Sequence, residues 1–288
     1  MSRIVHLPDG RQLAIEESGD PNGRPVFLLH GTPGSRLGPR PRSSRLHHMG
    51  IRLIAFDRPG YGGSDRKLGR TVADAAADVA ALADVLGIGQ FAVLGRSGGA
   101  PHALACAALL PERTVRVAAL VGLAPNGVDG LDWFAGMTQA NIIDFSAARL
   151  GFQAVTERLE PAAEQIRADP FRMIAQLYND MTVSDRIVLA DIGVRKMLVS
   201  NFAEGLRESA AGWVDDVMAF MSPWGFDPGD ISVPVLLWHG AEDHFIPPGH
   251  GVWLGDRIPG ATSIVAPGGS HFDLPDGYSV QEQLLGDP

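Results

Sequence analysis

Cysteine is nearly absent from this sequence: Cys106 is the one cysteine among 288 residues. A single thiol excludes an internal disulfide framework and any zinc cluster built on several cysteines. No other spacing of metal-ligating side chains stands out along the chain, so we expect no metal site. Hydrophobic residues make up 45% of the sequence, which supplies ample apolar material for a large core without such cross-links.

Positive charge is also in short supply. Lysine and arginine together number 24 against 33 aspartates and glutamates, so the formal net charge is -9. A nucleic-acid-binding protein normally carries the opposite sign, because it must neutralise phosphates. An acidic surface is likewise little attracted to an anionic membrane. We therefore expect a small-molecule substrate, with no nucleic-acid partner and no membrane partner.

Long apolar runs are missing as well. No segment reaches the roughly 18 uninterrupted apolar residues expected of a membrane span. Met1 to Gly10 carries no positive region followed by an apolar stretch, which is the pattern of a secretory signal. The sequence therefore predicts a cytoplasmic protein.

Short apolar runs alternate with helical stretches over much of the chain. This alternation is typical of an α/β fold in which helices flank a mostly parallel central sheet. The turn signal Pro8-Asp9-Gly10 predicts a hairpin between residues 3–7 and 12–18. Periodicity predicts helices over 71–86 and 100–110. Further strands are predicted at 26–29, 53–56, 91–94, 117–123, 233–238 and 263–266.

The rhythm changes between residues 126 and 226, where strand-like runs become scarce and helical patches dominate. We interpret 126–226 as a helical cap, or lid, inserted into a core domain formed by 1–125 and 227–288. Trp133, Phe134 and Trp213 of this segment are candidate substrate-pocket residues. Asp215 and Asp216 follow Trp213; a solvated helix end is the favoured interpretation, and binding of a substrate amine is the alternative.

The motif Gly95-Arg96-Ser97-Gly98-Gly99 follows a predicted strand and opens a predicted helix. A serine on such a sharp turn points its oxygen out of the sheet, where it can act as a nucleophile. The turn is strained, so its neighbours must be small, which accounts for the glycines two positions before and after the serine. Ser97 is thus the candidate nucleophile.

A second motif, His30-Gly31-Thr32-Pro33-Gly34, also follows a predicted buried strand. Acyl transfer requires backbone N–H donors for the oxyanion that forms on attack. Pro33 has no N–H, so the backbone amides of Thr32 and Gly98 are the candidate donors.

Two further motifs follow the last two predicted strands. His239-Gly240-Ala241-Glu242-Asp243 supplies a candidate acid, for which spacing favours Asp243 over Glu242. Gly268-Gly269-Ser270-His271-Phe272 supplies His271 as the candidate base. The chain order of serine, acid and histidine belongs to one of the several folds that carry such a triad.

Taken together, the segments HGTPG, DRPGYGGSD, GRSGG, HGAED and GGSHF resemble the α/β-hydrolase superfamily, and in particular its capped esterases and proline-iminopeptidase-like enzymes. The resemblance covers almost the whole chain outside the cap. It implies a triad of Ser97, Asp243 and His271, an oxyanion hole formed by Thr32 and Gly98, and no cofactor. It also implies that His30 supports the oxyanion loop and that the Asp57-Arg58-Pro59-Gly60 turn is architectural.

The predicted activity is hydrolysis of a carboxylic ester or lactone of a small to medium apolar substrate, with the cap as an apolar lid. The alternative activity is that of a proline-iminopeptidase-like aminopeptidase. Relatives with that activity usually have HGGPG and a tryptophan after the serine, where this chain has Thr32 and Gly98. A ligand receptor without turnover, or a biosynthetic acyl-transfer or cyclase enzyme, would show the same motifs. Epoxide hydrolases and haloalkane dehalogenases use an aspartate nucleophile on this fold, and Ser97 argues against them.

Only 17 residues follow His271, and within them Gln281 to Leu285 offers little more than a helical turn. We expect this shorter edge to leave apolar surface for self-association as a homodimer.

Overall fold

The computed structural model describes residues 2–273, whose strands form one eight-stranded sheet. The strand order is β1-β2-β4-β3-β5-β6-β7-β8. β1 and β2 are antiparallel, as are β2 and β4, and the remaining neighbours are parallel, which confirms the mostly parallel sheet. The strands are β1 (Ser2–His6), β2 (Gln12–Gly19), β3 (Arg24–Leu29), β4 (Ile51–Phe56), β5 (Phe91–Arg96), β6 (Thr114–Leu120), β7 (Val235–Gly240) and β8 (Thr262–Ala266).

The predicted N-terminal hairpin is confirmed. Val5 of β1 pairs with Leu13 of β2, and both side chains are buried. Gly10 turns the chain with φ of +88°, a backbone conformation that glycine adopts without steric cost.

Helices lie on both faces of the sheet, as an α/β fold requires. α2 (Asp74–Val85) and α3 (Gly99–Leu109) confirm the two predicted helices. At the start of α2, the N–H and hydroxyl of Thr71 donate to Asp74 Oδ2 (2.7 and 2.9 Å). Two further helices, α1 (Ser43–His48) and α10 (Gly249–Arg257), also pack against the sheet. The sequence patterns did not predict α10.

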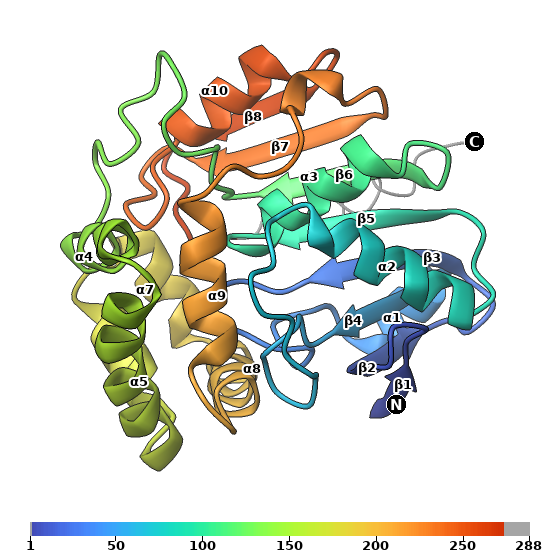
Figure 1. The fold of residues 1–288 in the computed structure, drawn as a ribbon, viewed down its shortest axis with the longest axis horizontal. Helices are drawn as coiled ribbons and strands as arrows, with labels where there is room; N and C mark the ends of the chain where they lie inside the picture. Colours follow the sequence, from blue (N-terminus) through green and yellow to red (C-terminus); the bar gives the residue numbers. More distant parts are fainter. Residues whose placement is uncertain (1, 274–288) are drawn as a thin grey trace.

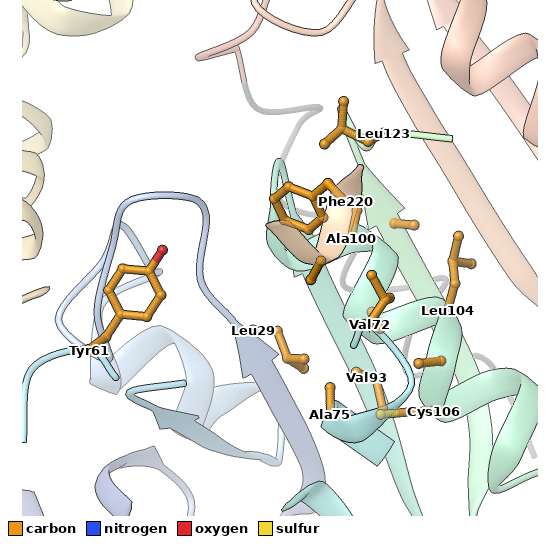
Figure 2. Packing of buried hydrophobic residues seen from close by; sticks show 14 of the residues in the cluster. Leu29, Tyr61, Val72, Ala75, Val93, Ala100, Leu104, Cys106, Leu123 and Phe220 are labelled. Atoms are coloured by element: carbon orange, nitrogen blue, oxygen red, sulfur yellow. The ribbon is translucent and has the colours of Figure 1, made fainter. Parts of the chain in front are cut away.

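Two apolar layers pack against the sheet because alternate residues of a strand point to opposite faces. Phe27 and Leu29 of β3 belong to the layer that includes α2 and α3, whereas Val26 and Leu28 belong to the layer that includes Leu46 of α1. Figure 2 shows part of the first layer, with side chains of β3, β5 and α3 packed together. This double burial explains why the central strands are continuous apolar runs.

The ends of β6 and β7 differ from the prediction in ways that bear on the site. β6 ends at Leu120 rather than at residue 123, because Val121 turns the backbone to φ of +46°. Val121 still donates its N–H to the carbonyl of Trp238 (2.8 Å). β7 continues to Gly240, two residues beyond the prediction, which brings its carboxyl end next to Asp243.

A helical segment separates β6 from β7 in the chain, and we call residues 126–226 the inserted segment. Figure 1 shows its helices gathered on one side of the molecule, at the left of the sheet. They are α4 (Gln139–Ala147), α5 (Phe152–Ala168), α6 (Phe171–Tyr178), α7 (Val183–Ala190), α8 (Ile192–Gly205) and α9 (Ala211–Phe220). Two 3₁₀ turns, Ala148–Leu150 and Pro228–Asp230, complete the helical elements of the described chain.

Within residues 2–273, none of the helices has the length and apolar character needed to cross a membrane. The stretch Gln281 to Leu285 lies outside the described residues, so the homodimer expected from that edge stays a prediction.

Candidate active site

Ser97 lies at the carboxyl end of β5, on the turn into α3. Its φ is +53°, a region that non-glycine residues rarely adopt. The turn is held by hydrogen bonds from Ser97 N–H to the carbonyl of Leu120 (2.8 Å) and from Ala100 N–H to the carbonyl of Ser97 (2.9 Å). A serine in this conformation between strand and helix has the geometry of a nucleophile elbow.

The flanking glycines leave no room for a side chain. A Cβ on Gly95 would lie 2.4 Å from the carbonyl oxygen of Gly99, and one on Gly99 would lie 2.1 Å from that of Leu29. Both positions therefore need a residue without a side chain, as the small neighbours expected around the serine imply.

The loop after β3 packs directly against this elbow. A Cβ on Gly31 would lie 3.4 Å from Cβ of Ser97, and one on Gly98 would lie 2.1 Å from Oγ1 of Thr32. Thr32 thus occupies the space that a side chain at position 98 would need. The two departures from the iminopeptidase-like pattern, at 32 and 98, are sterically coupled.

His271 and Asp243 meet at the same edge of the sheet. Nδ1 of His271 lies 2.8 Å from Oδ2 of Asp243, in hydrogen-bond contact. The other oxygen, Oδ1, accepts the backbone N–H groups of Phe245 and Ile246, both at 2.9 Å. Each oxygen of the carboxylate is therefore engaged, and its orientation toward the imidazole is fixed.

Burial by itself would raise the pKa of Asp243, because a charge is poorly solvated inside a protein. The charge and hydrogen bond of His271, together with His239 and the amide of Ile246, outweigh burial and lower the pKa below its usual value. Asp243 therefore stays ionised at neutral pH and is suited to stabilise a positive imidazole.

Arg96 connects the elbow with the loop that carries His271. Its Nη2 donates to the carbonyl of His271, and both terminal nitrogens contact the carbonyl of Asp273 (3.3 and 3.4 Å). Burial lowers the pKa of Arg96 to about 10, so the guanidinium is still charged at neutral pH. The sequence motif contains Arg96 but gives no sign of this contact, which spans 175 positions.

Asp216 of α9 is fully buried beneath the loop after β3. Its Oδ1 accepts from Arg58 Nη1 (2.5 Å) and Arg70 Nη2 (2.6 Å), and its Oδ2 from Arg58 Nη2 and Tyr61 Oη (both 2.7 Å). The hydroxyl of Thr32 also donates to Oδ2. Burial opposes ionisation, but the charges of Arg58 and Arg70 hold the pKa of Asp216 well below its usual range.

The expectation of a solvated helix end at Asp215 and Asp216 was wrong. Asp215 is also buried, and both its oxygens accept from Arg66 (2.8 and 2.7 Å). The arginine partners of both acids come from the chain between β4 and α2, about 150 positions earlier, so the local sequence could not reveal them. Neither acid lines the cavity described next, so neither is placed to bind a substrate amine.

A cavity of about 390 Å³ opens beside the elbow. Ser97, Gly98, Thr32 and His271 line it from the sheet side. The inserted segment contributes mostly apolar side chains, including Phe145, Met173, Val188, Phe202, Trp213 and Phe220. The candidate nucleophile, the candidate base and both oxyanion candidates of the sequence therefore line one largely apolar cavity.

Of the three predicted pocket residues, Trp213 lines this cavity, whereas Trp133 and Phe134 do not. Trp133 lies behind the cavity wall, because its ring packs edge-on against Phe145, which lines the cavity, and against His250. Its indole N–H donates to the carbonyl of Ala124 (2.8 Å). Trp133 and Phe134 lie in a turn before α4, so helical periodicity could not place their side chains.

The remaining buried histidines make structural contacts. Nε2 of His30 accepts the backbone N–H of Arg58 (3.0 Å) behind the oxyanion loop, and burial lowers its pKa well below the usual value. His102 and His250 are buried too, and burial lowers the pKa of each to about 4. Within the described chain, no group of three or more histidines, cysteines or acids is arranged to hold a metal ion.

Known proteins share both the sequence pattern and the architecture. The sequence model of the alpha/beta hydrolase fold family matches residues 24–278. A proline iminopeptidase from Xylella fastidiosa is 36% identical over 135 residues, which cover 46% of this chain and 42% of that protein. Epoxide hydrolase B from Mycobacterium tuberculosis is 34% identical over 134 residues, 45% of this chain and 38% of that protein. The chain thus spans less than half the length of these curated relatives.

Solved structures extend the likeness in fold to nearly the whole chain. An alpha/beta hydrolase fold protein from Nakamurella multipartita has a TM-score of 0.70 at 23% identity, over 98% of this chain and 97% of that one. An enol-lactonase from Burkholderia xenovorans has a TM-score of 0.64 at 21% identity, over 98% of both chains. With the family match over residues 24–278, the conclusion is that this chain belongs to the alpha/beta hydrolase fold family.

Proposed function

We propose that this protein is a serine hydrolase that cleaves a carboxylic ester or lactone of a small to medium apolar molecule, through an acyl-enzyme on Ser97. The observation that carries the proposal is the contact of His271 with Asp243 at 2.8 Å, on the same cavity as Ser97. A base oriented by a buried carboxylate next to a serine elbow is the arrangement that activates a serine oxygen.

The proposed reaction needs only side chains and backbone of this protein. His271 removes the proton from Ser97 as its oxygen attacks the substrate carbonyl, and Asp243 stabilises the positive imidazole. The backbone N–H groups of Thr32 and Gly98 hold the oxyanion. His271 then protonates the leaving alcohol, and a water activated by the same histidine releases the acid and restores Ser97.

The cavity lining favours an apolar substrate. Phenylalanine, tryptophan and aliphatic side chains of the inserted segment make up much of the wall facing Ser97. Such a surface stabilises an acyl or alkyl group by removing it from water. We propose that residues 126–226 act as the cap that encloses this group.

A proline-iminopeptidase-like activity is the second candidate, because proteins of that name are among the relatives matched in sequence. Its substrate carries a free amine, which calls for an unpaired acid at the cavity. Asp144 is the one acid among the described lining residues, and its carboxylate already accepts a hydrogen bond from Arg158. This pairing favours the ester or lactone over the peptide.

The test is steady-state hydrolysis of a short-chain p-nitrophenyl ester, with proline p-nitroanilide measured in parallel. We expect ester turnover by the wild type and a loss on the order of a thousandfold or more in Ser97→Ala. Ser222→Ala is the matched control, since its hydroxyl donates to the carbonyl of Met218 (2.8 Å) and does not line the cavity.

Preferential turnover of the anilide would replace the ester proposal with the peptidase candidate. If neither wild type nor Ser97→Ala turns over either compound, the hydrolase proposal is wrong and a receptor without turnover becomes the better account. If both turn over equally, the acyl-enzyme on Ser97 is refuted.

A further inference from the structure

The loop that carries His271 is held from outside the sheet by α7 of the inserted segment. Asp185 lies in the first turn of α7, and its side chain is completely buried. Its Oδ1 accepts the backbone N–H of Phe272 (2.7 Å), and its Oδ2 accepts the hydroxyl of Ser270 (2.7 Å). One carboxylate therefore binds the residues immediately before and immediately after His271.

Asp185 also takes part in the start of its own helix. Thr182 and Asp185 form a capping box, in which Oδ2 of Asp185 accepts both the N–H and the hydroxyl of Thr182 (both 3.1 Å). Oγ1 of Thr182 in turn accepts the N–H of Asp185 (3.2 Å). A capping box normally only satisfies the free amides at a helix start. Here the same carboxylate also reaches a segment 85 positions away.

A second contact joins the same two segments. The hydroxyl of Ser184 donates to Oδ2 of Asp273, which also accepts the N–H of Ser270 (3.1 Å). The start of α7 and the histidine loop are thus connected through both Asp185 and Asp273.

We propose that Asp185 is a positioning residue for His271. By binding Ser270 and Phe272, it holds the backbone of His271 at the place where the ring meets Asp243, on the cavity that Ser97 also lines. A displacement of about 1 Å at a reacting group can lower a rate about a hundredfold, so loss of such support lowers the rate even when every reacting group is present. The inserted segment is then part of the catalytic framework as well as a cover. This proposal rests on the proposed hydrolase function.

Substitutions at three residues separate an effect on the position of His271 from an effect on stability. Asp185→Ala removes both contacts to the histidine loop, and Ser270→Ala removes one of them. Thr182→Ala is the matched control, because it weakens the start of α7 yet leaves both contacts of Asp185 to the loop. Ester hydrolysis gives kcat and KM, and circular dichroism verifies that each variant is folded.

We expect kcat of Asp185→Ala to fall about tenfold to a hundredfold with KM changed less than threefold, because apolar substrate contacts are untouched. Ser270→Ala should lose less, and Asp185→Asn should recover part of kcat through the amide oxygen that still faces Phe272 N–H. Thr182→Ala should stay within about twofold of the wild type. Ser270→Ala keeps the proposal testable if Asp185→Ala does not fold.

A readout that needs no turnover accompanies the kinetics. In protein with ¹⁵N-labelled histidine, the imidazole N–H of His271 that faces Asp243 is assigned by its absence in His271→Ala. We expect this signal in the wild type and in Thr182→Ala, and its loss or broadening in Asp185→Ala.

The outcomes separate the two proposals. If turnover depends on Ser97 but Asp185→Ala keeps both kcat and the histidine signal, or Thr182→Ala loses as much as Asp185→Ala, positioning by Asp185 is refuted and the hydrolase stands. If no turnover is found yet Asp185→Ala loses the histidine signal, the hydrolase fails while the role of Asp185 in placing His271 stands.

Discussion

Asp216 on α9 and Asp185 on α7 are both fully buried carboxylates of the inserted segment, yet their surroundings differ. Asp216 faces the guanidinium groups of Arg58 and Arg70, and through Thr32 it contacts the loop after β3. The hydrogen-bond donors around Asp185 are neutral hydroxyls and backbone amides, and they belong to its own helix and to the histidine loop.

The difference shows that burial alone does not define the role of an acid. A carboxylate between two buried arginines is a charge that the fold depends on, because removing it strands both partners. A carboxylate bound by neutral donors leaves weaker unpaired groups when it is removed, so its loss affects position more than folding. We therefore expect substitutions around Asp216 to act mainly on stability and those around Asp185 mainly on rate.

Asp216→Ala should give the largest effect. It leaves Arg58 and Arg70 buried without a counter-charge, and breaking a buried pair in this way costs about 3–5 kcal/mol in the free energy of unfolding. Asp185→Ala should cost about 1–3 kcal/mol. Urea denaturation of the two variants measures the contrast, and an equal loss in both would remove the distinction between the two acids.

We call Asp216 and its partners Arg58, Arg70, Tyr61 and His102 the Asp216 cluster. Acid should destabilise this cluster through His102, whose Nε2 lies 3.5 Å from Oδ1 of Asp216. Burial, with the charges of Arg58 and Arg70, lowers the pKa of His102 from 6.5 to about 4, so between these values the unfolded chain binds more protons. Stability should then fall as the pH drops from about 6.5 to 4, with His102 contributing on the order of 3 kcal/mol.

The pKa of Asp216 is lowered, so its contribution is constant over that range and is lost only as the pH falls below its usual value toward the pKa of the folded state. Denaturation between pH 7 and 4 should show a weaker pH dependence in His102→Gln than in the wild type. Ser270→Ala, in the Asp185 cluster, should keep the wild-type dependence. Identical slopes in wild type and His102→Gln would contradict the assignment.

Gly98→Ala tests the loop after β3, which Asp216 contacts through Thr32. The new methyl would meet Oγ1 of Thr32 at 2.1 Å, so the loop must move, and we expect kcat/KM to fall about a hundredfold. Thr32→Gly in the same chain removes the obstacle and should restore part of the rate. Additive losses in the double variant would show that the two positions are not coupled.

Asp191→Ala should give the smallest effect. Asp191 caps α8 by accepting the N–H groups of Gly193 (2.7 Å) and Val194 (3.0 Å), at an exposed position away from both clusters. Loss of such a cap costs about 1 kcal/mol and should leave kcat unchanged. A fall in kcat comparable to that of Asp185→Ala would mean that any weakening of the inserted segment impairs the site.

The sequence could place the three triad candidates at the sheet edge because each belongs to a short motif next to a strand. Ser97, Asp243 and His271 follow β5, β7 and β8, and parallel strands bring their carboxyl ends to one edge of the sheet. The prediction required only local patterns and the order of the strands.

The contacts of the inserted segment could not be predicted in this way. The pairing of Asp216 with Arg58 spans 158 positions, and that of Asp185 with Ser270 spans 85. Helical spacing places such acids on a face of a helix but does not identify the partner that the face meets. Trp133 lies in a turn before α4, and its ring is covered by the cavity-lining Phe145, a neighbour that the local sequence does not identify.

The most direct test of the central claim is intact-mass spectrometry of protein mixed with a p-nitrophenyl ester and quenched in acid within the first turnovers. We predict a mass increase equal to the acyl group, located on the peptide that contains Ser97 and absent from Ser97→Ala. An acyl group on another residue, with undiminished turnover in Ser97→Ala, would contradict the assignment of Ser97 as nucleophile.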